Sequence, residues 1–282
     1  MTIAVTGATG ALGTLVVDAL LERVPATEIV ALVRDLEKAV PLAEKGVTVR
    51  HFDYDQPQSL ARELDDVTDL LLISGNAVGQ RFDQHRAVID AAVTAGVRRL
   101  VYTSVLHADT ATLPVAPEHV QTEQYLADAG IAHVLLRNGW YHENYLGELQ
   151  TAPSTGTVLT SAGDGRVASA ARADYAAAAA AVLTTPEAQP VYELSGDVAW
   201  SFDDLAADLS AVTGTQIEVA RVDADSQRET LLGAGLDAGL VEFIVAVDAG
   251  IAAGELADVN GQLSSLIGRP TTPLVEVLRG AR

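Results

Sequence analysis

The chain has 282 residues, which is enough for one large domain or two smaller ones with a well-buried core. It contains no cysteine, which excludes disulfides, thiolate metal sites and thiol catalysis. The formal net charge is −20, and such a surface repels nucleic acids and anionic membranes, so we expect neither as a partner. Met1 leads directly into an apolar run and no tract is long enough to span a membrane, so we predict a cytoplasmic protein.

The first thirteen residues predict a strand, a glycine-rich turn and the start of a helix. Residues 3–5 form an apolar run, and from residue 12 the apolar residues follow a helical period. Gly7 would allow a sharp turn, Gly10 would let a pyrophosphate approach the backbone, and Gly13 would let the helix lie close to the sheet. The helix N-terminus would point free N–H groups at a phosphate. We therefore predict a mononucleotide or dinucleotide cradle, formed by Gly7, Thr9, Gly10, Ala11 and Leu12.

Strand-like and helical segments then alternate with short connections. The predicted strands are 28–34, 47–53, 69–74, 99–104 and 133–137, and the predicted helices are 36–45, 59–64, 83–95 and 118–129. Residues 69–74 are almost purely apolar, which indicates burial on both faces of a sheet. This rhythm predicts an α/β fold with a doubly wound parallel sheet of the Rossmann type.

After residue 138 the alternation becomes irregular. We predict a short strand at 157–161, an alanine-rich helix at 174–183 and a last sheet strand at 191–195, followed by mostly helical chain with one strand at 216–222. The predicted helices of this part are 202–212, 238–247 and a tail from 274. We expect an NAD(P)-binding Rossmann domain of residues 1–150, completed by 172–195. A smaller α/β substrate-binding lobe would comprise 151–171 and 196–282.

Candidate cofactor residues follow the ends of the predicted strands, where open α/β sheets bind ligands. Arg34 suits the 2′-phosphate of NADPH, whereas Asp35 would suit the ribose of NADH, and we favour NADPH. Asp53 is expected either at the adenine or as the N-cap of the next helix. The remaining predicted cofactor residues are Ser74, Gly75, Asn76, Thr103, Ser104, Asn138 and Gly139.

The glycine spacing, Gly-x-x-Gly-x-x-Gly, resembles that of atypical and extended short-chain dehydrogenases/reductases. Better-known members carry a Tyr-x-x-x-Lys pair after the fifth strand, but here Tyr125 is followed by Ala129 and no lysine occurs after Lys45. His119, near the start of the predicted helix 118–129, would then protonate a substrate oxygen, with a solvated or structural histidine as the alternative. His107 is a second candidate with weaker placement.

Aromatic residues are sparse in the chain, yet three of them fall between residues 140 and 145. Trp140 and Tyr141 would form a flat wall beside a nicotinamide ring, and Asn144 would add an amide. A hydrophobic plug between the two lobes is the alternative. The predicted catalytic residues are therefore His119, Tyr141 and Asn144, and no metal site is expected.

Several segments together resemble the NmrA-like, atypical short-chain group, in particular its bacterial quinone oxidoreductases. These segments are Thr6–Gly13, Ala31–Arg34, Val78–Arg81, Tyr102–Asp109, Leu136–Tyr141, Arg172–Ala176 and Leu266–Thr272. The resemblance implies a flavin-free reductase that prefers NADPH, with a Rossmann domain and a small C-terminal lobe. Related plant reductases carry a catalytic lysine at the place of His119, which supports a catalytic role for this histidine and puts a lysine-type mechanism in doubt.

The predicted activity is hydride transfer from NADPH to a quinone or a similar conjugated carbonyl. His119, with Tyr141 or Asn144, would stabilise the developing oxyanion. Two alternatives remain at this point: a carbonyl reductase or alcohol dehydrogenase of the same fold, and a regulator that binds NADP(H) without turning it over. A homodimer is compatible with the sequence but not determined by it.

Overall fold

The computed structural model describes residues 1–77 and 79–282, and the chain divides into two compact units. The first unit comprises Met1–Asp109, Pro117–Asn138 and Arg172–Leu194, and the second comprises Thr110–Ala116, Gly139–Ala171 and Ser195–Arg282. Residues 139–150, which the sequence analysis assigned to the Rossmann domain, fall in the second unit. Of the Val78–Arg81 segment, Val78 lies outside the described residues.

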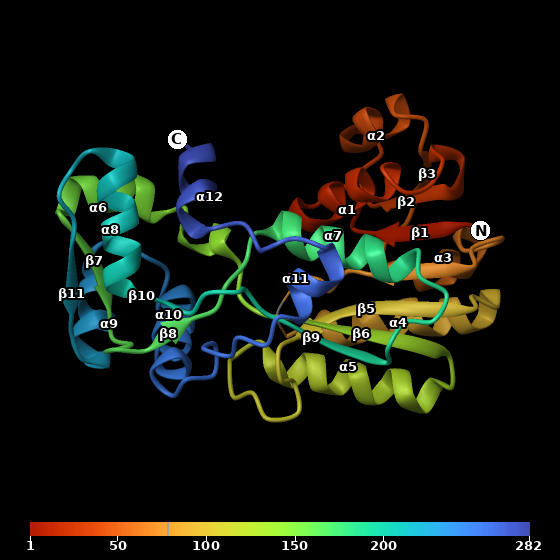
Figure 1. Cartoon of the computed structure of the whole chain (residues 1–282). Coiled ribbons are helices and arrows are strands. Elements are labelled where there is room, and N and C mark those ends of the chain that lie inside the picture. The colour runs from red at the N-terminus through yellow and green to blue at the C-terminus, as the bar shows by residue number, and fades with distance from the viewer. Residues whose placement is uncertain (78) are drawn as a thin grey trace. The chain divides into compact units, whose positions relative to one another are not determined.

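The first unit is built on a seven-stranded parallel sheet (Figure 1). Its strands, in spatial order, are β3 (Thr48–His51), β2 (Ile29–Val33), β1 (Ile3–Thr6), β4 (Asp69–Leu72), β5 (Arg99–Val105), β6 (Ala132–Asn138) and β9 (Val191–Leu194). All residues of β1, β2 and β4 are buried, because helices cover both faces of the sheet. The strand order reverses between β1 and β4, so the carboxyl ends of these two strands flank the switch point where such sheets bind ligands.

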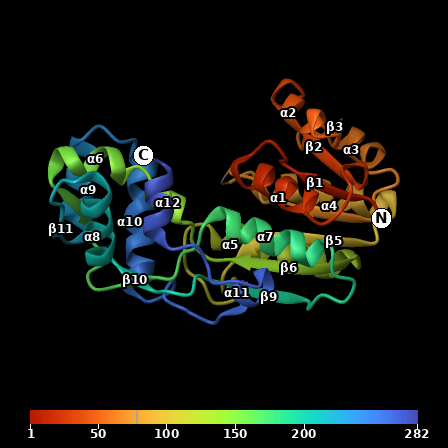
Figure 2. The same cartoon turned by 45° about the horizontal axis from the view of Figure 1, so that its top comes forward.

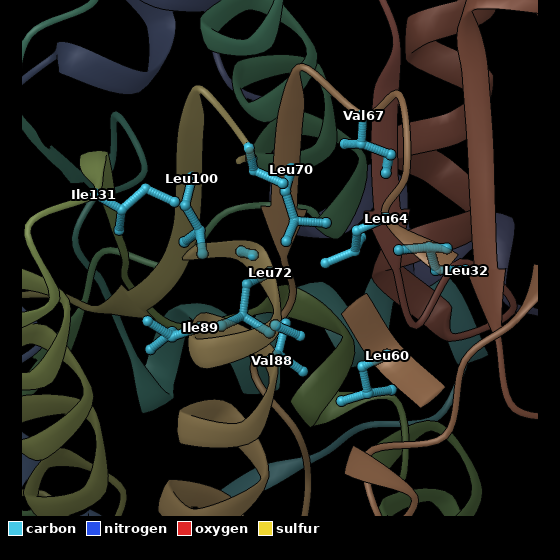
Figure 3. Close-up of a cluster of buried hydrophobic side chains, with 14 of the residues drawn as sticks. Leu32, Leu60, Leu64, Val67, Leu70, Leu72, Val88, Ile89, Leu100 and Ile131 are labelled. Carbon is cyan, nitrogen blue, oxygen red and sulfur yellow. The ribbon is translucent and has the colours of Figure 1, made fainter. Parts of the chain in front are cut away.

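One face of this sheet is covered by α3 (Pro57–Glu63), α4 (Arg81–Ala95) and α5 (Ala116–Ala129). Figure 3 shows the core on this side, where Leu70 and Leu72 of β4 lie among Leu60, Val88 and Ile89 from the helices. These side chains are fully buried. Because alternate residues of a strand point to opposite faces, Leu71 belongs to the other side of the sheet.

The opposite face carries α1 (Ala11–Leu21) and α7 (Arg172–Leu183), which pack against each other (Figure 1). Most of the alanine run of α7 is buried, namely Ala176 and Ala178 to Ala181. Small side chains let two helices approach closely, so the alanine-rich composition serves packing. The remaining helical pieces of this unit are short: η1 (Ala26–Glu28), η2 (Glu37–Ala39) and α2 (Val40–Glu44).

The second unit is mainly helical and contains two small strand pairs. β7 (Thr157–Thr160) pairs in parallel with β11 (Glu218–Arg221), and β8 (Arg166–Val167) pairs antiparallel with β10 (Trp200–Ser201). Its helices are η3 (His142–Tyr145), α6 (Glu148–Thr155), α8 (Phe202–Thr213), α9 (Ala224–Gly233), α10 (Ala238–Ala252), α11 (Gln262–Ile267) and α12 (Leu274–Gly280). Figure 2 shows α8 beside α6 and β11. The apolar side of α8, which includes Leu209, packs into a core with Trp200 and Leu278.

Across residues 1–77 and 79–282, every helix is too short or too polar to traverse a lipid bilayer.

Candidate cofactor and active site

The glycine turn after β1 forms an exposed backbone cradle at the carboxyl edge of the sheet. Gly7 has a φ of +57°, which only glycine adopts without strain, and its carbonyl accepts a hydrogen bond from Gly10 N–H at 2.8 Å. A Cβ on Gly13 would lie 2.2 Å from the Gly7 carbonyl oxygen, so no larger residue fits there. Helix α1 begins at Ala11 with Gly10 as N-cap and with no side-chain cap. Its first N–H groups are therefore available to an anion.

The strand ends next to this turn bring the predicted cofactor residues of the first unit together along one edge. Because β1, β4, β5 and β6 are consecutive parallel neighbours, the residues at their carboxyl ends form a row. The row consists of the glycine turn, Ser74, Gly75, Asn76, Thr103, Ser104 and Asn138. Arg34 and Asp53 follow β2 and β3, on the far side of β1.

The structure distinguishes the two residues that follow β2. The carboxylate of Asp35 accepts N–H hydrogen bonds from Glu37 at 3.0 Å and Lys38 at 3.3 Å, so it is engaged by the backbone at the start of the short helix η2. The Arg34 side chain is exposed and makes no hydrogen bond or ion pair within the described chain. A guanidinium without a protein partner suits a phosphate ligand, which favours the NADPH interpretation over NADH.

Asp53 is half-buried and lies two residues beyond the end of β3. Its carboxylate accepts hydrogen bonds from the Asp55 N–H at 3.2 Å and from Gln56 Nε2 at 3.2 Å. These contacts form a turn within the loop, and the N-cap of α3 is Gln56. The N-cap alternative for Asp53 is therefore wrong, while its contact with adenine stays a prediction.

Side chains tie down the segment that follows β4. The Ser74 N–H donates to Thr103 Oγ1 at 2.8 Å, and the Gly75 N–H donates to His85 Nε2 at 3.0 Å. These two backbone N–H groups are therefore not available to a cofactor. Within this segment, the Ser74 hydroxyl, the exposed Asn76 and the carbonyl groups are what a cofactor would meet.

At the end of β5 a serine hydroxyl is hydrogen-bonded, whereas at the end of β6 an asparagine side-chain oxygen has no hydrogen-bond partner within the described residues. Ser104 Oγ donates to Glu123 Oε1 at 2.5 Å. Asn138 Oδ1 is buried and has no hydrogen-bond partner within the described residues. An orphaned acceptor of this kind costs free energy unless a ligand or water satisfies it, so its position at the sheet edge points to a bound donor group.

Sequence reasoning missed a charged network beside this row. Arg137 of β6 donates to Glu123 Oε2 at 2.7 Å and to Glu193 Oε1 of β9 at 2.8 Å. Glu193 also accepts the N–H of His107 at 2.8 Å, which holds His107 at a left-handed φ of +51°. Charged residues within the carboxyl halves of two adjacent strands are the signal that would have indicated it, because strand interiors are otherwise apolar.

His119 occupies an environment unlike the one expected for a proton donor. Its side chain is 5% exposed, with Nε2 at 3.1 Å from Arg81 Nη1 and Nδ1 at 2.7 Å from Tyr102 Oη. Burial, followed by the charge of Arg81 and the neighbouring His85, lowers the pKa of His119 to about 3. The ring is neutral near pH 7 and both nitrogens are engaged. This geometry favours the structural alternative, and donation of a proton to substrate stays a prediction that the geometry does not support.

The other predicted residues, Gly139, Tyr141 and Asn144, belong to the second unit. Tyr141 forms an isolated β-bridge with Ala170 and precedes η3, and Asn144 is exposed. Trp140 is partly buried against the core of this unit. Tyr145, the third aromatic residue, stacks edge-on against Trp200 at 4.7 Å. Two of the three aromatic rings therefore contribute to the core of the second unit. The flat wall formed by Trp140 and Tyr141 and the alternative of a hydrophobic plug between the lobes both stay predictions.

The residues of the first unit fit a dinucleotide bearing a 2′-phosphate. The glycine turn and the uncapped helix α1 would hold the pyrophosphate, and Arg34 would hold the 2′-phosphate. The orphaned Asn138 Oδ1 would accept a hydrogen bond from the cofactor. No cluster of three metal-ligating side chains occurs in the part of the chain that the structure describes.

A glycine turn at the switch point of a parallel sheet defines a Rossmann-type dinucleotide-binding protein. The chain belongs to the NmrA-like family, which it matches over residues 1–249. It is 49% identical over 275 residues to quinone oxidoreductase 2 of Escherichia coli strain K12, covering 97% of this chain and 96% of the relative.

The solved structures that are similar along the whole chain include two in complex with a cofactor. An NADPH-dependent quinone oxidoreductase from Escherichia coli, in complex with NADPH, matches with a TM-score of 0.96 at 48% identity, covering 99% of both chains. The triphenylmethane reductase of Citrobacter sp., in complex with NADP(H), matches with a TM-score of 0.94 at 38% identity, covering 100% of both chains. The NmrA-like resemblance and the Rossmann α/β fold predicted from the sequence are confirmed.

Proposed function

We propose that the protein is an NADPH-dependent reductase that transfers a hydride to a quinone or a similar conjugated carbonyl. The proposal rests on the likeness to the NADPH complex of the Escherichia coli quinone oxidoreductase over 99% of both chains. Two features of this chain also support the proposal. The glycine turn leads into a helix without a side-chain cap, and Arg34 has no protein partner within the described residues. Arg34 would select NADPH by its 2′-phosphate, and the backbone N–H groups at the start of α1 would neutralise the pyrophosphate.

NADPH, when bound, supplies a hydride, and the quinone takes this hydride and one proton to become a hydroquinone. The protein's part is to bind the two molecules and to orient them for hydride transfer. Because a quinone accepts a hydride readily, its reduction does not depend on the Tyr-Lys pair that this chain lacks. Water is a sufficient proton source, so the proposal uses no side-chain acid, and His119 keeps its buried place between Arg81 and Tyr102.

Tyr141 and Asn144 remain predicted to stabilise the developing oxyanion. We assign cofactor binding to the first unit and a role in substrate binding to the second. The reaction would draw on the NADPH pool of the cytoplasm, where we place the protein, and we propose neither a flavin nor a metal. A homodimer stays a prediction that light scattering would test.

The test is to mix the purified protein with NADPH and a benzoquinone and to follow the absorbance of the reduced cofactor. We expect oxidation well above the uncatalysed rate, and faster with NADPH than with NADH. Binding of NADPH by calorimetry without turnover of any quinone or ketone would favour a cofactor-sensing regulator. Turnover of ketones but not of quinones would indicate a carbonyl reductase. If neither coenzyme binds, the proposal fails.

A further inference from the structure

A cluster of polar side chains is buried in the first unit beneath the segment that follows β4. It consists of Arg81 and His85 from α4, Tyr102 from β5, and His119 and Thr122 from α5, and each is at most 5% exposed. Buried polar groups are costly unless their hydrogen bonds are made, so a cluster of five serves a purpose beyond packing. The proposed reaction uses none of them directly.

The hydrogen-bond direction within the cluster follows by elimination. A guanidinium can only donate, so His119 Nε2 must accept from Arg81, which leaves the ring proton on Nδ1 to donate to Tyr102 Oη. The Gly75 N–H can only donate, so His85 Nε2 accepts it and Nδ1–H donates to Thr122 Oγ1 at 3.0 Å.

The hydroxyl of Thr122 completes this arrangement, because it donates to the Glu118 carbonyl at 2.7 Å. Both histidines are thus neutral and carry their proton on Nδ1. A second ring proton would face a donor at either Nε2 atom, and for both rings burial and the charge of Arg81 lower the pKa to about 3.

The cluster and its neighbours hold the backbone after β4 at several points. His85 holds Gly75, while the Glu118 carboxylate accepts the N–H of Gly79 at 3.0 Å and of Phe82 at 3.3 Å. The Gly75 and Gly79 amides lie beyond the end of β4 at Leu72, where no strand ladder supplies a partner, and the Phe82 amide lies in the first turn of α4, where no helical acceptor is available. Side chains from α4 and α5 therefore fix a segment that ladder hydrogen bonds do not reach.

We propose that His85, oriented by Thr122, is a positioning residue that holds Ser74, Gly75 and Asn76 in the conformation that receives NADPH. The inference rests on the proposed function, in which this segment lies along the cofactor. The Thr122 hydroxyl fixes the His85 ring by accepting from Nδ1, and the ring then presents its Nε2 lone pair to the Gly75 N–H. Arg81, His119 and Tyr102 pack around this pair and keep water away from it.

The variants His85→Phe, His85→Gln and Thr122→Val test this proposal in the full-length protein. Phenylalanine removes both ring hydrogen bonds, whereas the glutamine Oε1 restores an acceptor for Gly75. Valine matches threonine in shape and removes only the acceptor for His85 Nδ1–H. Val88→Ala is the matched control, because Val88 lies on the same helix, is fully buried among Leu72 and Ile89 (Figure 3) and makes no polar contact.

The measurements are KM for NADPH, KM for a benzoquinone, kcat and the melting temperature. We expect His85→Phe to raise KM for NADPH about tenfold, as the loss of a buried hydrogen bond implies, with KM for the quinone unchanged. His85→Gln should recover most of this effect, and Thr122→Val should give a smaller rise in the same direction. Val88→Ala should lower the melting temperature without changing KM for NADPH.

The proposal is overturned if His85→Phe and Val88→Ala raise KM for NADPH equally at similar melting temperatures, or if KM is unchanged in folded His85→Phe or Thr122→Val protein. Thr122→Val alone decides the question if His85→Phe does not fold. Failure of the proposed function would look different, since the wild-type protein would then either bind no NADPH or bind it without reducing a quinone. The exchange rate of the Gly75 amide, slow in the wild type and fast in Thr122→Val, would in that case still report whether His85 holds the segment.

Discussion

The Arg34 guanidinium has no carboxylate partner in the described chain, so we expect its charge to act on a bound ligand. We predict that Arg34→Gln raises KM for NADPH roughly ten- to hundredfold, the range for a lost charge-assisted hydrogen bond, and leaves KM for NADH unchanged. Steady-state kinetics with both coenzymes would measure this difference.

Arg23→Gln is the control for Arg34→Gln, since Arg23 is also exposed in the first unit but lies just beyond the C-terminal end of α1. It removes the same charge without touching the sheet edge. Equal effects of the two substitutions on KM for NADPH would show that net charge, not a contact with the 2′-phosphate, determines the preference.

The two buried histidines make stability depend on pH. For His85 and His119 the folded-state pKa is about 3, because both are buried beside Arg81, while an unfolded histidine titrates near 6.5. The unfolded chain then binds more protons below pH 6.5, so their contribution is complete above that pH and is lost as the pH falls towards 3. Between pH 7 and pH 5 the expected loss is about 2 kcal/mol for each histidine.

Urea unfolding at pH 7 and pH 5 measures this loss. The double variant His85→Gln/His119→Gln should lose less free energy of unfolding over this interval than the wild type does. His51→Gln removes an exposed histidine and should behave like the wild type. If the double variant and the wild type have the same pH dependence, the histidines do not remain neutral in the folded protein.

At the residue scale, the features that could be predicted from the sequence are those formed by residues close together in the chain. The glycine turn could be recognised because strand, turn and helix N-terminus are consecutive in the chain. The environment of His119 could not, because its partners Arg81 and Tyr102 are 38 and 17 positions away and meet only once the sheet forms. A partial signal existed, since Arg81 and His85 lie one turn apart on the otherwise apolar side of α4.

At the scale of elements, Asp69 joins β4, β5 and α7. Its fully buried carboxylate binds Arg99 Nε at 2.7 Å, and Arg99 also donates to the Leu183 carbonyl at the end of α7. Asp69→Asn would leave the Arg99 guanidinium, whose side chain is 11% exposed, without its counter-charge. We predict a loss of about 3 kcal/mol in the free energy of unfolding, measured by urea titration.

The pair formed by Asp66 and Arg50 supplies the control for this substitution. The Asp66 side chain is 69% exposed, and Asn tolerates its left-handed φ of +67°. Asp66→Asn should therefore cost less than about 1 kcal/mol. A similar loss for both substitutions would contradict the assigned role of the buried ion pair.

Elements that carry a clear apolar period were predictable, and the others were not. The helix expected at 118–129 is observed as Ala116–Ala129, while the one expected at 36–45 is divided into η2 and α2. Helix α9 was missed because Gln227 is its only buried residue, so it has no apolar stripe. Helix α6 was not predicted because Pro153 interrupts the helical pattern, and the two-residue strands β8 and β10 are too short to show any period.

At the scale of the whole molecule, the net charge of −20 opposes the cofactor that the glycine turn is proposed to bind. NADPH carries negative charge on its pyrophosphate and its 2′-phosphate, so distant carboxylates slow its approach at low ionic strength. Raising the salt from about 10 mM to about 150 mM shortens the screening length from about 30 Å to about 8 Å. This change screens repulsion from the rest of the surface more than it weakens a direct contact with Arg34.

We therefore predict that the association rate of NADPH, measured by stopped flow, rises several-fold over this salt range. Arg34→Gln should lower the affinity while keeping the same upward salt dependence, because the repulsion comes from the whole surface and the contact from one residue. KM for a neutral benzoquinone should not respond to salt, which separates charge screening from a general effect on the enzyme. An association rate that falls with salt would mean that a local positive field around the glycine turn outweighs the acidic surface.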